Sequence, residues 1–392
     1  MTNAAPRFAV RRQISPGPAI DPYALAGNTG ILYDSGDRLL VGIGSALTLP
    51  LEDGLDGPSG LERIRRLLAA IPCDDEAGET GSAVMAFGAL PFDRSEPTSL
   101  TVPELIYERR SNRQEWVTVI GRAFSGDPRD ELTAAACGTR AASTVERLPG
   151  SPIREEETAG AVVRPLSSDQ EFLDIVGEAV ATIERGELTK VVLARQVEVD
   201  LEQPIGVPEL LGRWRAMEPN CTVFSMPTRE GQFVGASPEL LVERHGDQVH
   251  CRPLAGSTGQ MSEQDGADFR SSSKETLEHR LVAEAIGRAL APLCSSLDLP
   301  AEPALVRLHN IMHLGTSIHG VLLRRPTADH PDGEVPSALD LVSALHPTPA
   351  VGGVPTDRAL DTIGKLECEL RGPYAGPVGF VDGNGDGRWV VG

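Results

Sequence analysis

Apolar positions in the first third of the chain switch between strand-like and helical spacing. Residues 30–44, GILYDSGDRLLVGIG, hold two β-favouring runs around a Ser-Gly-Asp turn and predict a hairpin. Residues 61–71, LERIRRLLAAI, have apolar positions at helical spacing and predict a short amphipathic helix. Residues 126–165 are polar and small, which predicts a long surface connection between two halves, 1–125 and 166–392.

The second half begins with a clear helix pattern. Ser167 and Gln170 match a capping box, and the helix should end near Gly186. The apolar positions that recur at helical spacing are Phe172, Ile175, Val176, Ala179, Val180 and Ile183. The following segment, Thr189–Val199, favours β-structure almost throughout and predicts one strand packed with this helix.

Lys190 stands at the start of that predicted strand. Alternation places it on the same face as Val192 and Ala194, where burial would lower the pKa of its amine toward neutrality. A lysine at a strand end can also pack its stem and send its nitrogen into water. The pattern alone leaves both interpretations open.

A second helix is predicted within residues 268–294, DFRSSSKETLEHRLVAEAIGRALAPLC. Its expected buried stripe consists of Leu277, Leu281, Ala285 and Leu290. Glu275 and Glu278 project on one side of its first turns. Acids near a helix start usually form a solvated face, because the helix dipole favours them there, but two carboxylates at this spacing would also suit Mg²⁺.

Residues 233–259, FVGASPELLVERHGDQVHCRPLAGSTG, predict strands that a Gly-Ala-Ser-Pro break interrupts early. Glu239 follows the break directly and is followed by three apolar residues. Proline restricts the backbone and the small residues allow close approach, so the break would fix the direction of this carboxylate. A capped strand start with an exposed glutamate is the structural alternative.

Composition narrows the classes of function. The chain has 392 residues and a formal net charge of −20, which argues against a general nucleic-acid binder. An anionic substrate would therefore need a local cation or a metal ion. Six scattered cysteines show no metal spacing and predict reduced thiols. No apolar run approaches the ~20 residues of a membrane span and no secretory signal is visible, so we expect a cytoplasmic protein without a membrane partner.

Several motifs occur together in a known order. They are LTKVVLARQ, FVGASPELLVER, RPLAGST, KETLEHRLV, IMHLGTSIHG, LHPTPAVGGVP and RGPYAGPVGFVD, with AFGALPFDR in the first half. In order and approximate spacing the chain resembles the chorismate-utilising enzymes, which include isochorismate synthases, salicylate synthases and the chorismate-binding subunits of anthranilate and aminodeoxychorismate synthase. The resemblance implies an α/β (α+β) fold with large antiparallel sheets flanked by helices, built as one unit over residues 1–392.

The resemblance also implies roles for the two residues singled out above. Glu239 would be the general acid that protonates the leaving C4 hydroxyl of chorismate, which requires a carboxyl still protonated near neutral pH. Lys190 would be the base that takes a proton from water, whereas ammonia-using relatives carry glutamine there. Glu278, with Glu275 beside it, would hold Mg²⁺ against a substrate carboxylate.

The remaining implied residues surround the substrate. Gly256 and Ser257 resemble the loop that holds the substrate carboxylate, and His313 matches a histidine near the reacting hydroxyl. Tyr374 falls at an aromatic position facing the enolpyruvyl arm, and Arg371 in the same loop is interpreted as structural. Ala350 is typical of isochorismate synthases, whereas salicylate synthases tend to have threonine there.

The end of the chain departs from the family pattern. In relatives, the strand at Trp389–Val391 continues into an arginine, a hairpin and a helix with further metal-binding glutamates and a lysine. The resemblance thus implies that 166–392 is a catalytic half without its usual C-terminal strands and helix, either a truncated form or a short variant without activity. The final β-favouring run also predicts a strand whose partner is missing.

The expected function is Mg²⁺-dependent conversion of chorismate to isochorismate for siderophore or menaquinone biosynthesis. The alternatives are a salicylate synthase and a truncated, non-catalytic chorismate-binding homologue. Chorismate and isochorismate are the expected ligands. We expect no organic cofactor, no glutaminase subunit and no nucleic acid, and we expect a monomer.

Overall fold

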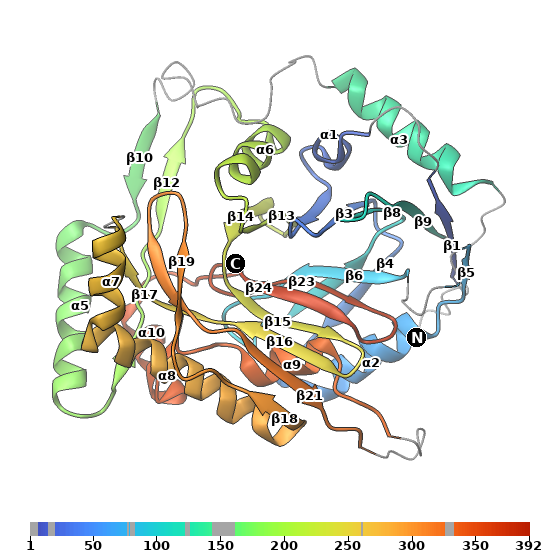
Figure 1. Ribbon diagram of the computed structural model, residues 1–392. Helices are drawn as coiled ribbons and strands as arrows, with labels where there is room; N and C mark the ends of the chain where they lie inside the picture. Colours follow the sequence, from blue (N-terminus) through green and yellow to red (C-terminus); the bar gives the residue numbers. More distant parts are fainter. Residues whose placement is uncertain are drawn as a thin grey trace.

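Two large sheets face each other in the computed structural model, with helices against the outer face of each (Figure 1). The structure describes residues 7–14, 20–76, 78, 83–121, 126–142, 161–259, 262–325 and 333–392. Neighbouring strands run antiparallel, and the exception among the described strands is the parallel pair β1 and β5. This architecture confirms the predicted large antiparallel sheets flanked by helices.

Sheet A and sheet B are named here for the two large sheets. Over the described residues, sheet A comprises, in spatial order, β14 (Gln232–Ser237), β13 (Thr222–Pro227), β2 (Ile31–Asp34), β3 (Arg38–Ile43), β8 (Leu105–Arg110), β9 (Glu115–Gly121), β1 (Phe8–Gln13) and β5 (Cys73–Asp75). Sheet B comprises, over the same part of the chain, β18 (Cys294–Asp298), β21 (Ile318–Leu322), β16 (Gln248–Arg252), β15 (Leu240–His245), β24 (Gly387–Val391), β23 (Pro377–Asp382), β6 (Met85–Ala89), β7 (Thr98–Val102) and β4 (Leu47–Leu51).

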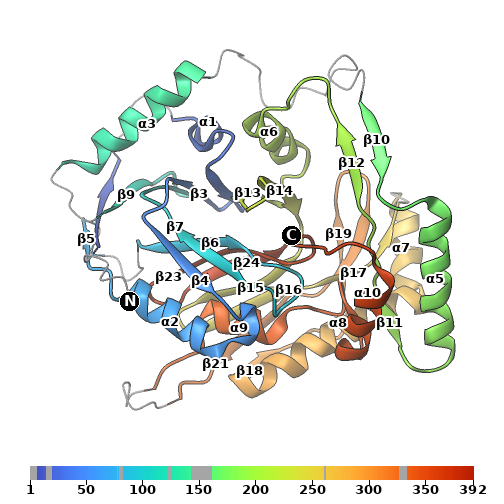
Figure 2. The ribbon, with the colours of Figure 1, turned by 180° about the vertical axis from the view of Figure 1, so that it is seen from behind.

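Helices complete the outer layers, as the view from behind also shows (Figure 2). Those against sheet A are α1 (Pro22–Ala26), α3 (Pro128–Ala142) and α6 (Val207–Met217). Those against sheet B are α2 (Pro58–Ala69), α8 (Ser273–Leu290) and α9 (Ala338–Leu345). The short 3₁₀ turns η1 (Gly54–Asp56) and η2 (Ala291–Leu293) lie next to α2 and α8.

Strand β2 shows why the central strands of sheet A are apolar on both faces. Tyr33 points between the sheets and its ring meets Phe380 of sheet B edge-on, with centroids 5.5 Å apart. Leu32 points the other way and packs with Leu25 of α1 and Leu211 of α6. A strand covered on both sides buries both sets of alternating side chains, so it reads as a continuous apolar run.

Smaller sheets gather at one end of the sandwich (Figure 1). They are β17 (Leu254–Thr258) with β20 (Met312–Gly315) and β19 (Ala304–Arg307), β11 (Lys190–Val191) with β22 (Gly353–Val354), and β10 (Val162–Pro165) with β12 (Val197–Asp200). Helices α5 (Asp169–Glu184), α7 (Glu263–Ser271) and α10 (Thr356–Leu366) lie at the same end. This end contains most of the predicted site residues.

In the first part of the chain, the structure confirms two predicted elements and corrects one. β2 and β3 form the predicted hairpin, and α2 is the predicted amphipathic helix. The predicted connection over 126–165 is wrong for Pro128–Ala142, which form α3. Proline at the helix start and the acids Asp130 and Glu131 in the first turn favour a helix despite the polar composition. Residues 143–160 lie outside the described residues.

The start of α5 and the strand after it also differ from prediction. Ser168 is the N-cap of α5 and Glu171 closes the capping box, one position later than the predicted Ser167 and Gln170. A carboxylate is a stronger acceptor than an amide, which favours this register. The predicted single strand over 189–199 is split into β11 and β12, because side chains take over the backbone bonds between them, as described below.

The buried stripe of α8 is rotated relative to prediction. Leu277 is 46% exposed, and of the predicted positions Leu290 is fully buried while Leu281 and Ala285 lie at the margin. The residues that face the core are His279, Val282, Ala283, Ile286, Gly287 and Leu290. The buried stripe begins with His279. Because histidine is polar, the pattern of apolar positions did not indicate this face.

The last strand, β24, has a paired strand on each side, so the prediction that its partner is missing is wrong. β24 pairs with β23, with Val390 opposite Val378, and with β15, with Trp389 opposite Val242. Trp389 is completely buried. One partner, β23, directly precedes β24 in the chain. The other, β15, is distant in sequence, so the local sequence could not predict that pairing.

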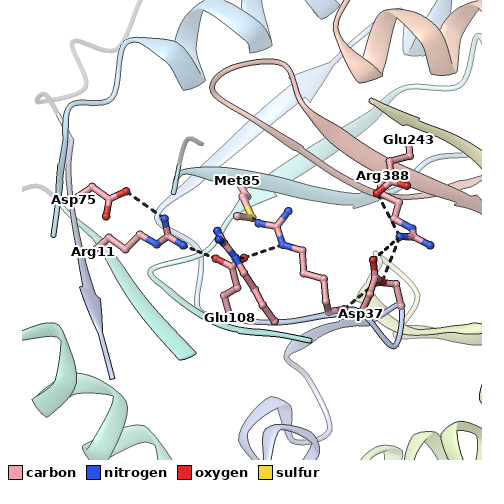
Figure 3. Close-up of polar contacts among 10 residues, drawn as sticks. Arg11, Asp37, Asp75, Met85, Glu108, Glu243 and Arg388 are labelled. Atoms are coloured by element: carbon pink, nitrogen blue, oxygen red, sulfur yellow. Dashed lines mark hydrogen bonds and ion pairs between the residues drawn. The ribbon is translucent and has the colours of Figure 1, made fainter. Parts of the chain in front are cut away.

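A network of ion pairs lies between the two large sheets (Figure 3). Glu108 accepts from Arg11 at 2.8 Å, Arg38 at 2.9 Å and Arg110 at 2.8 Å. Burial opposes ionisation of Glu108, but the three arginines hold its pKa below the ordinary value. Charge compensation therefore lets sheet A bury this carboxylate.

Two further observations concern the described residues as a whole. No helix among them is long and apolar enough to cross a membrane. The cysteines at positions 73, 221, 251, 294 and 368 are free thiols.

Candidate active site

Lys190 is held at the start of a very short strand. It lies opposite Val354 in the β11–β22 pair. Its side chain is 12% exposed, and its Nζ lies 2.9 Å from Glu278 Oε1. The nitrogen therefore meets a carboxylate instead of open water.

The two predicted metal ligands occupy the first turns of α8. Ser272 caps the helix, and Glu275 lies in the first turn, where the helix dipole favours a carboxylate. Glu278 lies nearly one turn further on. Glu275 packs against Gly256, since a Cβ placed on Gly256 would come within 2.9 Å of Glu275 Oε2. Gly256 also has φ +72°, a backbone conformation that favours glycine.

Glu239 stands at a corner where the chain passes from sheet A to sheet B. β14 ends at Ser237 and β15 begins at Leu240. The Glu239 N–H donates to Ser237 Oγ at 3.3 Å, and its carbonyl accepts from Val391 N at 3.1 Å. These bonds fix the backbone, so the corner rather than strand alternation determines the direction of the carboxylate. The predicted break is therefore wrong for Gly235–Ser237, which pair with β13 inside β14, and the corner consists of Pro238 and Glu239.

The environment of Glu239 favours its protonated form. Burial raises the pKa of its carboxyl from 4.5 to about 7, against the opposing effects of a hydrogen bond from the Leu254 backbone and of the Lys190 charge. The residue keeps some exposure, so this carboxyl lies at the edge of a site rather than sealed in the core. A carboxyl with such a pKa can donate a proton near neutral pH.

Ser257 and His313 face each other on neighbouring strands. They are opposite in the β17–β20 register, and Ser257 Oγ lies 3.0 Å from His313 Nδ1. The same ring nitrogen lies 3.1 Å from the Gly256 carbonyl oxygen. Burial lowers the pKa of His313, although the Gly256 carbonyl acts in the opposite direction. The neutral His313 ring, the Ser257 hydroxyl and the backbone at Gly256 therefore form one hydrogen-bonded group beside Glu275.

Ala350 and Tyr374 lie at the margins of this arrangement. Ala350 is partly buried against the sandwich core, in the turn just before β22. Tyr374 is 56% exposed and, with Arg195 and Phe233, lines a cavity of about 570 Å³. None of the other predicted catalytic, substrate-binding or metal residues in the described chain lines this cavity. Tyr374 therefore stands apart from the other predicted site residues, whereas Lys190 contacts one of them, Glu278.

Sequence reasoning missed His279, which directly follows Glu278. Its ring is 2% exposed, and Nε2 lies 2.7 Å from Thr316 Oγ1. Burial lowers the pKa of His279 to about 4, an effect that the Ala255 backbone opposes and the Lys190 charge adds to. The ring is neutral at physiological pH and anchors α8 to the end of β20. Its helical spacing from Val282 and Ile286 was the available signal.

The chemistry of Glu275 and Glu278 fits Mg²⁺. Mg²⁺ binds through one or two carboxylates and takes its other oxygen ligands from water and substrate. Among the described residues no group of three or more His, Cys, Asp and Glu side chains could hold a metal. Lys190 is already paired with Glu278 and would compete with the metal for that carboxylate.

Comparison with known proteins places this chain in a family. A family model described as "Chorismate binding enzyme" matches residues 31–392. The chain belongs to the chorismate binding enzyme family. A Mycobacterium tuberculosis protein, provisionally named isochorismate synthase MenF, is 36% identical over 356 residues, covering 86% of this chain and 82% of the relative. Isochorismate synthase DhbC of Bacillus subtilis is 31% identical over 370 residues, covering 90% and 80%.

Solved structures agree on the fold. MenF, the menaquinone-specific isochorismate synthase of Escherichia coli, superimposes with a TM-score of 0.73, covering 98% of this chain and 84% of that structure. At 22% identity this likeness shows the chorismate binding enzyme fold alone. The relatives identified by sequence carry the name of one enzyme, an isomerase-type user of chorismate.

Proposed function

We propose that this chain is a cytoplasmic isochorismate synthase that converts chorismate to isochorismate, with water entering at C2 and the C4 hydroxyl leaving. The observation that carries the proposal is Glu239, a carboxyl with a pKa of about 7 held at a sheet corner within electrostatic reach of Lys190. The names of the relatives support the same reaction. The product would feed siderophore or menaquinone biosynthesis.

Glu239 would act as the general acid. Protonation turns the C4 hydroxyl into water, a far better leaving group, and the acid must still carry its proton when substrate is bound. A pKa of about 7 leaves half of the carboxyls protonated at neutral pH. In the reverse direction the same carboxylate would take the proton back.

Lys190 would act as the base for the incoming water. Its Nζ lies 2.9 Å from Glu278 Oε1, so the proposed base lies beside the proposed metal ligands. Mg²⁺ bound by Glu275 and Glu278 would neutralise a carboxylate of the substrate.

The linked group of Gly256, Ser257 and His313 would bind and orient the substrate. The Ser257 hydroxyl can donate to a carboxylate oxygen, and the neutral His313 ring can hydrogen-bond a hydroxyl. Ala350 carries no polar side-chain group, which favours release of isochorismate over elimination of pyruvate.

The test of the reaction is product analysis. Chorismate and Mg²⁺ are incubated with the protein, without ammonia or glutamine, and the products are separated by chromatography. We expect isochorismate without pyruvate. Fluorescent salicylate with an equal amount of pyruvate would identify a salicylate synthase instead, and recovery of bound but unchanged chorismate would identify a non-catalytic binding protein.

The metal is tested by calorimetry, independently of turnover. We expect Glu275→Gln and Glu278→Gln each to weaken Mg²⁺ binding, because each removes one anionic oxygen donor. Glu284→Gln, on an exposed part of the same helix, is the matched control and should leave binding unchanged. Equal affinities for all four proteins would remove these carboxylates from the proposal.

A further inference from the structure

The segment that carries Lys190 leaves its sheet after two residues. β11 ends at Val191, and Val192 makes one more bond, its N–H donating to the Gly352 carbonyl at 2.8 Å. The chain then runs without strand pairing until β12 begins at Val197. A partly buried backbone that loses its neighbouring strand needs other hydrogen-bond partners.

Two side chains supply those partners. Arg371 Nη2 donates to the Val192 carbonyl at 2.7 Å, and the Ala194 N–H donates to Glu367 Oε1 at 2.8 Å. Arg371 and Glu367 also bind each other, through Nε to Oε2 at 2.8 Å and Nη2 to Oε1 at 2.5 Å. This bidentate pair has a fixed geometry, so it holds the segment after Lys190 in one position.

The same guanidinium holds a second segment of the site. Arg371 Nη1 donates to the Val351 carbonyl at 2.8 Å, directly after Ala350. The Cζ atom of Arg371 lies over the Phe92 ring, 4.1 Å from its centroid. Arg371 therefore joins the segment of Lys190, the proposed base, to the turn of Ala350, the proposed product determinant.

The ion pair of Arg371 and Glu367 is almost completely buried. The side chains of Arg371 and Glu367 are 4% and 6% exposed, so both charges have lost most of their water. Such a pair contributes little net stability unless its geometry is excellent. Four of the five N–H donors of Arg371 already have protein partners, so the guanidinium is committed to the protein rather than to a ligand.

We propose that Arg371, held by Glu367, is a positioning residue that fixes the segment of Lys190 relative to the turn of Ala350. The inference rests on the proposed function, since it assigns a catalytic purpose to the position of Lys190. It goes beyond the structural role that sequence alone suggested for Arg371. A displaced base reacts slowly even when substrate still binds, because reaction requires close alignment of the reacting atoms.

The test compares Arg371→Lys with a matched control. Lysine keeps the charge but cannot reproduce the fork that serves Val192, Val351 and Glu367 together. We expect kcat to fall about tenfold or more, on the scale of the ~10²-fold cost of a small misplacement, with KM changed less than about twofold. The control is Arg213→Lys on α6, whose ion pair with Glu209 also joins residues four apart in sequence and whose arginine side chain is 11% exposed. It should keep wild-type kcat.

A second variant and a second measurement protect the test from a folding defect. Glu367→Gln keeps an oxygen for the Ala194 N–H but removes the ion pair, and we expect a smaller fall in kcat. Hydrogen exchange is measured for residues 189–196 and 348–352. We expect faster exchange in both segments for Arg371→Lys and unchanged exchange for Arg213→Lys.

The outcomes separate this inference from the proposed function. A lower melting temperature with unchanged kcat, or a higher KM with unchanged kcat, would overturn the positioning role. If the wild-type protein forms no isochorismate, the proposed function fails. Hydrogen exchange alone then tests whether Arg371 positions the two segments. Faster exchange in both segments would then support positioning by Arg371, and exchange equal to that of the control would overturn it.

Discussion

Lys190 Nζ lies 2.9 Å from Glu278 Oε1, so the proposed base and a proposed metal ligand share one contact. The two groups are therefore coupled, because the Lys190 nitrogen occupies an oxygen that a metal would need. Loss of either side chain should change both proton transfer and metal binding.

Replacing Lys190 with glutamine tests the base. We expect Lys190→Gln to abolish isochorismate formation, a loss of ~10²–10⁴-fold, while chorismate still binds. Because the substitution also releases Glu278, Mg²⁺ should bind at least as tightly as in wild type. Steady-state kinetics, chorismate titration and Mg²⁺ calorimetry measure the three effects. Near-normal turnover would show that the base is another group.

Replacing Glu239 with glutamine tests the acid. We expect Glu239→Gln to suppress the forward and the reverse reaction alike, because protonation of the C4 hydroxyl in one direction is its deprotonation in the other. Its Mg²⁺ dependence should not change, since Glu239 is not a proposed ligand. Rates are measured from chorismate and from isochorismate. A defect in only one direction would contradict the assignment.

The same substitution should alter how stability depends on pH. The folded pKa of Glu239 is raised, so the folded protein holds a proton that the unfolded chain has lost between pH 4.5 and about 7. This contribution to stability is present below pH 4.5 and is lost as the pH rises through 7. Glu239→Gln should therefore be the more stable protein at pH 8, by at most ~3 kcal/mol, but not at pH 4. Urea unfolding at both pH values measures the difference, and a pH-independent difference would argue against a raised pKa.

Replacing Ala350 tests product choice. We expect Ala350→Thr to slow isochorismate release and to produce some pyruvate, because it adds a hydroxyl where salicylate synthases tend to have one. The effect should be partial, since elimination also depends on the orientation of bound isochorismate. Ala350→Val is the control, with the shape of threonine and no hydroxyl. Pyruvate from the valine variant, or none from the threonine variant, would exclude the hydroxyl as the cause.

The ion-pair network between the sheets should contribute to stability without affecting the reaction. Glu108→Gln leaves Arg11, Arg38 and Arg110 without their shared carboxylate (Figure 3), and we expect a loss of ~3–5 kcal/mol in the free energy of unfolding. The wild-type contribution is present above the unfolded pKa and is lost as the pH falls through the lowered folded pKa. Asp74→Asn, which breaks an exposed pair with Arg12, should cost at most ~1 kcal/mol. Equal losses in the two variants would contradict this view of the network.

The sequence by itself determined the features that depend on neighbouring residues. The hairpin of β2 and β3 follows from alternating apolar runs around a Ser-Gly-Asp turn, and α2 follows from helical spacing. Glu275 and Glu278 share the start of α8 because residues three apart on a helix lie on one side. The ordered motifs identified the family, which the comparison with known proteins confirms.

Only the tertiary structure decided how distant segments meet. Glu239 lies at a corner because β14 and β15 belong to different sheets, and Lys190 meets Glu278 because β11 packs near α8. The strand after Lys190 stops early because Arg371 and Glu367 satisfy its backbone instead of another strand. Strand partners and buried ion pairs depend on which faces remain open after the sheets have packed, and local propensity carries no information about those faces.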